Sequence, residues 1–514
     1  MLRAEWTKFR TVRGWVIGMI VAVLLTVLLG VFVAGAASIG CGATKSGRAC
    51  LPSIPIGPGG EAVADSFYFV HRPLAGNGTI TARLTSLTGR YGEGNGPVQV
   101  GQALANMAPG LVPWAKAGVI LQPGTRPGSA YAAVMATGAH GVRMQYDYTG
   151  DIAGLPGAVT ANTPRWLRLT RAGDMITGYD SADGRQWTAI GTVRLAGLPA
   201  VVQIGLFTTS PQHVQISTSF GGSTGQSTPS LATGKFADVS VSGAGRAGSW
   251  TGTAVGESGS ATPTVAGASG YRQSGAAFTV TGTGDISPVV PGPGVGYPSA
   301  TMEQSLAGAF AGLIVIVVVA AMFVTSEYRR GLIRVTLAAS PRRGRVLAAK
   351  AVIAGAVAFA AGLVASVASL ALGVPRFRAQ GMYVMPISAL SEVRVVIGTA
   401  AVLAVAAVLA VGVGAAVRRS AAAVTVAVTV VVVPYLLAML GVLPAGATAW
   451  LVRLTPAAGF AIQQSIPQYP QVDSVYSPAN GFFPLSPWAG FAVLCAYAAA
   501  ALALALVLLR RRDA

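Results

Sequence analysis

Histidine and cysteine are the side chains that most often bind metals or act as nucleophiles, and this chain of 514 residues has three of each. His71, His140 and His213 lie far apart, and none has a Cys or another His at the spacing of metal ligands. The chain has no G-x-x-x-x-G-K-S/T loop, because its only Gly-Lys pair, at 234 and 235, lacks the upstream Gly. We therefore expect no metal site, no cofactor bound by this chain and no P-loop for ATP.

Two cysteines, Cys41 and Cys50, follow a long apolar run by a few residues and enclose a short loop that contains Gly. If the run crosses a membrane toward an oxidising compartment, a disulfide between them is expected. Two unpaired thiols are the alternative. Cys495 lies alone inside another apolar run, where a small packing residue is the simplest interpretation.

The segment 325–350, TSEYRRGLIRVTLAASPRRGRVLAAK, combines many basic side chains with a few apolar ones. Leu332, Val335 and Leu337 predict a short amphipathic helix that ends before Pro341. Such a segment suits docking to another protein, although anionic lipid headgroups would attract it equally.

The N-terminal segment MLRAEWTKFRTVRGW places Leu2, Trp6 and Phe9 at helical spacing among basic residues. This pattern predicts a helix lying in the membrane interface. The alternative is a plain basic flank of the first apolar run.

Long apolar runs decide the class of protein. The chain is 52% hydrophobic and only 10% charged, against about 25% charged in soluble proteins, which argues against one large water-soluble enzyme. Runs long enough to cross about 30 Å of hydrocarbon lie at residues 15–37, 305–324, 351–372, 395–417, 421–442 and 488–509. We predict six transmembrane helices. A signal peptide is the alternative for the first run, but signal cores are shorter, at about 7–15 residues.

The interiors of these runs contain no Asp, Glu, Lys, Arg or His. Ion-coupled carriers, proton pumps and voltage sensors need buried ionisable groups, so the chain is not expected to be one of them. The spacings Gly14-x-x-x-Gly18 and Gly308-x-x-x-Gly312 allow close helix contact, or they arise by chance in a Gly-rich chain.

The net charge of +19 could indicate a nucleic-acid partner, so the location of the charges has to decide. Arg and Lys concentrate before the first run, in residues 325–350, after the fourth run and after the sixth. The positive-inside rule then predicts a multi-pass protein with cytosolic N- and C-termini and with residues 38–303 outside. Topology explains the charge, and no nucleic-acid partner is expected.

Residues 38–303 are rich in Gly, Pro and Thr, as in short strands joined by turns, and they predict an all-β extracytoplasmic domain. Ile80, Ala82 and Leu84 alternate with polar residues, which places one face on a core. The stretch RWLRLTRAGDMITGYDSADGRQWTAIG predicts three strands, with turns at 172–174 and 183–184. The composition of the tail, 244–303, predicts a Gly/Ser/Pro-rich linker, but apolar and polar residues still alternate over 277–283 as in a strand.

Two pairs of side chains in this domain admit two interpretations each. We expect Trp166 and Trp187 in the core rather than as platforms for sugar stacking. Asp180 and Asp183 flank a hairpin turn, which favours turn chemistry over calcium binding.

The domain resembles the laminin-G or concanavalin-like jelly-roll sandwich over residues 65–243. The resemblance rests on WAKAGVILQPGTRPGSAYAAVMATGAHGVRMQYDY, PRWLRLTRAGDMITGYDSADGRQWTAIG, VVQIGLFTTS and FADVSVSG. It implies a fold and little about function, since such sandwiches serve as lectins, enzymes and spacers. The paired acids of the glycosidase members are not evident.

The membrane part resembles the permease subunit of an ATP-binding cassette (ABC) transporter of the type-2 exporter superfamily, in a form common in bacteria with GC-rich genomes. The resemblance rests on EWTKFRTVRGW at 5–15, on residues 325–350, on LTPAAGFAIQQSIP at 454–467 and on the C-terminal PLSPWAGFAVLCAYAAAALALALVLLRRRDA. It implies a bacterial plasma-membrane protein that pairs with a second permease, as a homo- or heterodimer, and with cytosolic P-loop ATPase subunits that bind ATP and Mg.

The resemblance also implies where the ATPase binds. Two elements would contact the ATPase. One is the interfacial helix, which lies with the first span in residues 1–37. The other is the loop after the second span, which lies within the membrane part 304–514. The residues expected to dock the ATPase are Glu327, Tyr328, Arg329, Arg330, Leu332, Arg334, Val335, Leu337, Pro341, Arg342 and Arg343.

The leading hypothesis is therefore a non-catalytic membrane subunit of an ATP-driven exporter. A membrane-anchored receptor or adhesion protein that binds glycan or peptide is the alternative, but six spans and a basic loop exceed what an anchor needs. A third hypothesis is a membrane enzyme that acts on lipid or cell-wall material. The sequence argues against it, because no carboxylate or His pair lies at a membrane boundary.

Overall fold

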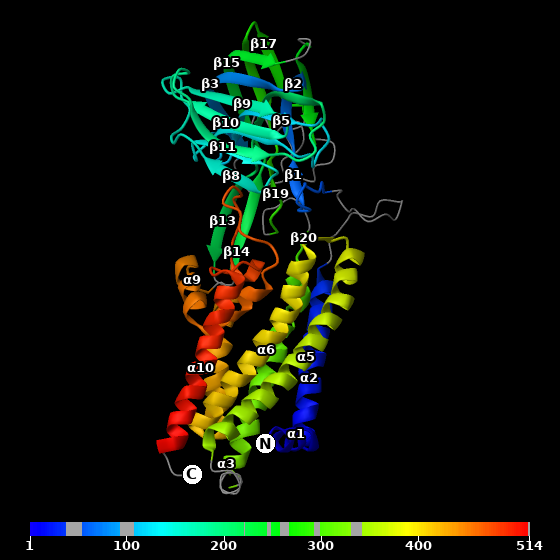
Figure 1. Cartoon of the computed structure of the whole chain (residues 1–514), viewed down its shortest axis with the longest axis vertical. Coiled ribbons are helices and arrows are strands. Elements are labelled where there is room, and N and C mark those ends of the chain that lie inside the picture. Colours follow the sequence, from blue (N-terminus) through cyan, green and yellow to red (C-terminus); the bar gives the residue numbers. More distant parts are fainter. Residues whose placement is uncertain are drawn as a thin grey trace.

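The computed structural model describes residues 1–37, 54–92, 107–219, 222–243, 248–256, 267–291, 299–329, 331, 342–440 and 442–511. It is a long helical bundle with a β domain standing on one end (Figure 1). Several residues singled out above lie outside the described ones: Cys41, Cys50, Arg330, Leu332, Arg334, Val335, Leu337 and Pro341. The predicted disulfide and amphipathic helix therefore stay predictions.

Among the described residues, six helical segments are long and apolar enough to cross a membrane, which confirms the predicted number. They are α2 (Arg13–Ala36), α3 (Ala309–Arg329) preceded by the 3-10 turn η2 (Met302–Leu306), α5 (Arg343–Ala379), α6 (Ala389–Val417), α7 (Ser420–Val431) with α8 (Val433–Met439), and α10 (Pro487–Arg511). The first is packed against α3 and α5 as a member of the bundle. Helix α5 extends well beyond the predicted 351–372 at both ends.

Close contact between α2 and α3 depends on glycine. A Cβ at Gly308 would lie 2.0 Å from the Thr26 carbonyl oxygen, and one at Gly312 would lie 2.2 Å from the Thr26 hydroxyl oxygen. The Gly308-x-x-x-Gly312 spacing is thus a packing contact. In contrast, Gly14 faces open space.

After α8 the chain returns toward the bundle instead of running directly to the last span. Helix α9 (Ala445–Leu454) is followed by the 3-10 helix η3 (Pro456–Gln463), all of whose residues are buried, and later by η4 (Pro478–Asn480). Segment η3 packs between α6 and α10. The apolar sequence PAAGFAI allows this burial, which the span prediction missed.

The β domain consists of two antiparallel sheets packed face to face. The first has eight strands: β3 (Gly78–Gly92), β4 (Met107–Pro109), β9 (Arg165–Ala172), β10 (Met175–Ser181), β11 (Thr188–Arg194), β15 (Ser230–Gly243), β17 (Gly270–Ser274) and β18 (Ala277–Gly282). The second has seven: β2 (Phe67–Ala75), β5 (Lys116–Gln122), β6 (Ala132–Thr137), β7 (Val142–Tyr146), β8 (Gly150–Ala153), β12 (Val201–Thr209) and β16 (Thr251–Val255). The predicted all-β domain is confirmed, and its jelly-roll identity stays a prediction.

The core between the sheets follows the predicted alternation. Ile80, Ala82 and Leu84 on β3 are fully buried, and the three strands predicted around the turns at 172–174 and 183–184 are β9, β10 and β11. The predicted strand at 277–283 is β18, so part of the Gly-rich tail belongs to the sheet.

The prediction that Trp166 and Trp187 are core residues is wrong. Both are only half-buried. Trp166 alternates out of phase with the buried Leu167 of β9 and so lies on the outer face of the first sheet, and Trp187 lies just before β11. There the Arg168 guanidinium lies 3.6 Å from the centre of the Trp187 ring, a cation–π contact.

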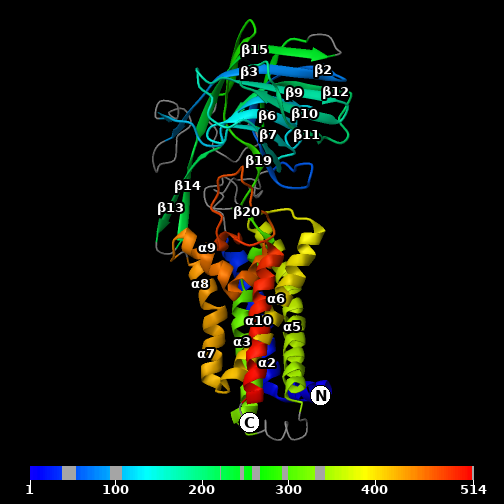
Figure 2. The ribbon, with the colours of Figure 1, turned by 60° about the vertical axis from the view of Figure 1, so that its left-hand side comes forward.

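Short pairings and one hairpin lie between the two sheets and the bundle. Strand β1 (Val63–Asp65) pairs with β19 (Ile286–Pro288), and β20 (Ser299–Ala300) pairs in parallel with β21 (Tyr383–Val384). The hairpin of β13 (His213–Ser219) and β14 (Gly222–Thr228) descends from the sheets toward α9 (Figure 2).

Candidate coupling site at the basic end of the bundle

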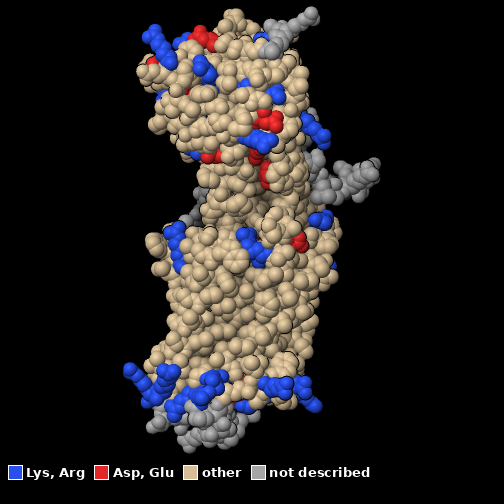
Figure 3. Space-filling view, in the orientation of Figure 1, with Lys and Arg blue, Asp and Glu red and all other residues tan. Residues whose placement is uncertain are grey.

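The end of the bundle far from the β domain carries a band of Lys and Arg, and we call it the basic end (Figure 3). Both termini lie there, together with helix α1 (Leu2–Thr11) and the facing ends of α3 and α5 (Figure 1). In the view of Figure 3 the flank of the bundle above this band is almost free of charge, as expected of a surface in contact with lipid.

Helix α1 is the predicted N-terminal helix, and it lies across the basic end (Figure 1). The backbone is extended at Val12, with φ −88° and ψ 100°, so the chain turns sharply into α2. Phe9 is buried in the bundle, whereas Leu2 and Trp6 are exposed. The helix therefore has one face on the protein and one face that leads toward the surrounding membrane.

Four charged side chains join α1 to α3 and α5, and we call them the charge network: Glu5, Lys8, Glu327 and Lys350. The Lys350 ammonium lies 2.8 Å from Glu5 Oε2 and 2.7 Å from Glu327 Oε1. The Lys8 ammonium lies 3.1 Å from Glu5 Oε1 and 3.0 Å from the same Glu327 oxygen. Two positive and two negative charges make the network neutral.

Burial makes this network sensitive to the loss of any member. Lys350 is only 2% exposed, and both glutamates are buried. Buried charges cost several kcal/mol to desolvate and are tolerated when each has its partners. Lys8 is the partly exposed member: its burial lowers its pKa, but hydrogen bonds with Glu327 and Glu5 outweigh this and leave the pKa raised.

Aromatic rings pack beneath the network. Phe323 of α3 lies edge-on to Phe9 at 5.5 Å and to Trp15 at 5.0 Å between ring centroids. The Lys350 ammonium lies 4.9 Å from the centre of the same Phe323 ring. Rings from α1, α2 and α3 thus shield the charges from water, which strengthens their attraction.

The structure divides the residues predicted to dock an ATPase. Glu327, one of the residues expected to dock the ATPase, is buried in the charge network. Tyr328 is half-buried, with the Arg418 guanidinium 5.3 Å from its ring centre. Arg329 and Arg342 are exposed at the two ends of the loop between α3 and α5. Arg343 donates a hydrogen bond to the Leu509 carbonyl at the end of α10, where a cation complements the helix dipole.

Sequence reasoning missed Glu5, Lys8 and Lys350 as members of one site. A signal was present, because Glu5 and Glu327 are the single acids in two otherwise basic segments, 1–14 and 325–350. Local spacing could not predict that these side chains contact one another, since Lys350 and Glu5 are 345 positions apart.

The opposite end of the bundle holds the β domain by other means. Gln471, between η3 and α10, donates hydrogen bonds to the Tyr148 and Thr149 carbonyl oxygens at 3.2 and 3.4 Å. Within the β domain, the fully buried Lys116 has its ammonium 2.8 Å from Asp285 Oδ1. An apolar cluster fills the remaining space: Ile54, Ala62, Val289, Val290, Met385, Ile466 and Phe482.

Comparison with known proteins gives one informative match. The family model described as ABC-2 family transporter protein matches residues 175–514. A search of the curated proteins finds no match.

Solved structures resemble the chain only weakly. One is a functionally unknown protein from Saccharomyces cerevisiae, with 12% identity and a TM-score of 0.23, over 37% of this chain and 82% of that one. Another is scytalido-glutamic peptidase with a transition state analog inhibitor, with 10% identity and a TM-score of 0.25, over 44% of this chain and 100% of that one. Likenesses this weak carry no argument about function. The family match, in contrast, spans more than half of the chain and all the membrane helices after α2, so the chain belongs to the ABC-2 family of transporter membrane proteins.

Proposed function

We propose that this chain is the permease subunit of an ABC exporter, that it forms part of the translocation pathway, and that its basic end lies in the cytosol. A separate P-loop ATPase would bind there with its ATP and Mg, and a second permease copy would complete the pathway. The basic band supports this orientation, because Lys and Arg favour the cytosolic side of a membrane. Residues 38–303 would then face outside.

The observation that carries the proposal is the position of the charge network around one loop. Glu327 is two residues before the end of α3, and Lys350 lies in the second turn of α5, so both ends of the loop 330–342 are held by the network. Glu5 and Lys8 extend the same network to α1. A push on the loop or on α1 would therefore reach two spanning helices directly.

Exposed charges at this loop would orient the ATPase, while the buried ones transmit its movement. Reversing Arg329, Arg330 and Arg334 to Glu puts wrong charges across the contact, a change that costs several kcal/mol in binding. Arg342, Arg343, Arg345 and Lys350 remain, so membrane insertion should persist. The matched control reverses three exposed arginines of the β domain, Arg185, Arg194 and Arg272.

The test is copurification from native membranes, with identification of the bound proteins by mass spectrometry. The wild-type chain and the control should bring down one P-loop ATPase that has no spans of its own, and the loop variant should lose it at normal membrane abundance. If the wild-type chain brings down no P-loop ATPase, the proposed function is wrong. If the loop variant retains the ATPase, the docking assignment is wrong.

A further inference from the structure

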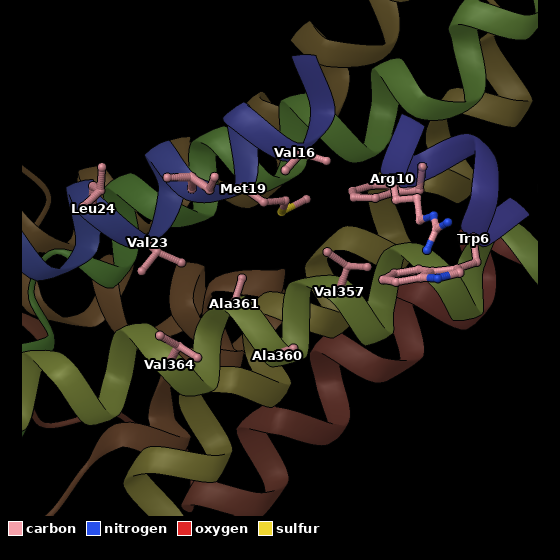
Figure 4. A pocket seen from close by; sticks show the side chains of 12 residues that line it. Trp6, Arg10, Val16, Met19, Val23, Leu24, Val357, Ala360, Ala361 and Val364 are labelled. Carbon is pink, nitrogen blue, oxygen red and sulfur yellow. The ribbon is translucent and has the colours of Figure 1, made fainter. Parts of the chain in front are cut away.

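A groove of about 550 Å³ opens between α1, α2 and α5 at the basic end. Figure 4 shows Trp6 and Arg10 of α1 at one end of it and Leu24 and Val364 at the other. Between these ends the lining side chains are apolar, with Met19 and Ala361 facing one another across the groove. No feature of the charge network lines this groove, so it is a separate site.

The length of the groove is close to the hydrocarbon thickness of one membrane leaflet. On α2 it is lined from Val16 to Leu24, a rise of about 12 Å at about 1.5 Å per residue. Half of a hydrocarbon core of about 30 Å is about 15 Å. Leu24 and Val364 are exposed at the deep end, so the groove opens to the membrane interior there.

The mouth of the groove carries one cation. Arg10 lines it and is exposed, and within the described part of the chain no carboxylate lies within ion-pair distance of its guanidinium. Lys8, two residues earlier on α1, points the other way and is paired with Glu5 and Glu327. Trp6 beside Arg10 is half-exposed, as is common for Trp at the level of lipid headgroups.

We propose that this groove binds one acyl chain of an anionic glycerophospholipid from the leaflet at the basic end, with the lipid phosphate on Arg10. An apolar channel of leaflet depth with a guanidinium at its mouth matches an acyl chain that ends in a phosphate, because Arg binds phosphate through charge-assisted hydrogen bonds. A helix from a second copy of the chain would fill the apolar part but bury Arg10 without a counter-charge, which is costly. The lipid would brace α1 against α2 and α5, and its binding does not depend on ATPase docking.

The experiment titrates the full-length chain, purified in mild detergent, with dioleoyl phosphatidylglycerol or dioleoyl phosphatidylcholine and counts bound lipid by native mass spectrometry. Phosphatidylglycerol should bind about five-fold more tightly, as expected for one Arg near the headgroup. Arg10→Gln should remove this preference. Arg13→Gln removes the same charge outside the groove and should keep it.

A second pair of variants tests the apolar part. Ala361→Phe fills the groove and should weaken the binding of both lipids about ten-fold, which is the effect of displacing roughly two methylene groups. Ala499→Phe, on an exposed face of α10, is the control and should change neither. Should Ala361→Phe fold poorly, the contrast between Arg10→Gln and Arg13→Gln still decides.

Three outcomes would overturn the proposal. The first is equal binding of both lipids in the wild type. The second is a phosphatidylglycerol preference that survives Arg10→Gln, or a lipid affinity that Ala361→Phe leaves unchanged. The third is efficient disulfide cross-linking between copies in membranes through Val364→Cys, which would make a second copy the occupant.

Discussion

At the basic end, three helices meet through two lysines and two glutamates that are largely removed from water. At the sandwich end, the bundle and the β domain meet through an apolar cluster and hydrogen bonds such as those from Gln471 to backbone carbonyls. Both ends use buried contacts between segments distant in sequence. They differ in how strongly each contact depends on the others.

This difference has a physical consequence. Apolar contacts are non-directional and add roughly in proportion to area, so a contact made of them tolerates small shifts. A buried ion-pair network requires every partner in place, because an unpaired charge in a low dielectric is expensive. The basic end therefore suits a role in transmitting movement as a unit, and the sandwich end suits a role as a stable platform.

The largest effect is expected from Lys350→Met. The substitution removes the buried one of the two lysines that Glu5 and Glu327 share and leaves only the partly exposed Lys8 between them. The loss of one partner of a buried pair costs about 3–5 kcal/mol. We expect a lower melting temperature of the purified chain and reduced membrane abundance. Thermal unfolding followed by size-exclusion chromatography measures this.

The matched comparison for this prediction is the triple variant Glu5→Gln, Glu327→Gln and Lys350→Met, which removes the three buried charges together and leaves only the partly exposed Lys8 charged. Its melting temperature should lie above that of Lys350→Met alone, since no buried charge is left unpaired. A single variant as stable as the wild type would show that the network does not hold the basic end together.

A pH effect is expected at the sandwich end, where Asp65 accepts hydrogen bonds from the Tyr148 hydroxyl and the Gly128 amide, both at 2.8 Å. Burial raises the pKa of Asp65 to about 7, against about 3.9 for an unfolded Asp. The folded state thus favours the neutral acid, and this stabilisation is complete below about pH 4 and is lost as the pH rises through about 7.

Asp65→Asn mimics the neutral acid at every pH. Between pH 5 and pH 8 the variant should lose less thermal stability than the wild type, as measured by melting temperatures of the purified chain. Asp174→Asn, at the turn between β9 and β10, is the control and should follow the wild type. If the melting temperature of Asp65→Asn fell with pH as steeply as that of the wild type, the assignment of the pH effect to this side chain would be contradicted.

The smallest effect is expected from Gln471→Ala, which removes the two hydrogen bonds to Tyr148 and Thr149. Hydrogen bonds of this kind contribute about 1 kcal/mol each. Hydrogen exchange should accelerate around 148–149 and 469–476 with little change in melting temperature. Gln468→Ala is the control, because the Gln468 side chain donates a hydrogen bond to the Phe483 carbonyl on the bundle side. In this variant, hydrogen exchange at 148–149 should stay unchanged. Equal acceleration of exchange in both variants would mean that Gln471 does not join the two parts.

The parts of the fold that depend on local pattern could be predicted. The six spans follow from the length of apolar runs, and the inward faces of β3 and β9 follow from alternation with a period of two. Where pattern was ambiguous the prediction failed. Trp166 is large and aromatic, but its place in the alternation puts it on the outer face, and this register should have outweighed its size.

What the sequence by itself determined is therefore the class of the protein: a helical bundle with an inserted β domain and basic segments at defined ends of its spans. Tertiary structure alone decided that Lys350 meets Glu5, that η3 turns back between α6 and α10, and that α1, α2 and α5 leave a groove with Arg10 at its mouth. The reason is physical. Hydrophobic length and period act over neighbouring residues, whereas the pairing of buried charges and the shape of a groove depend on which distant helices pack together.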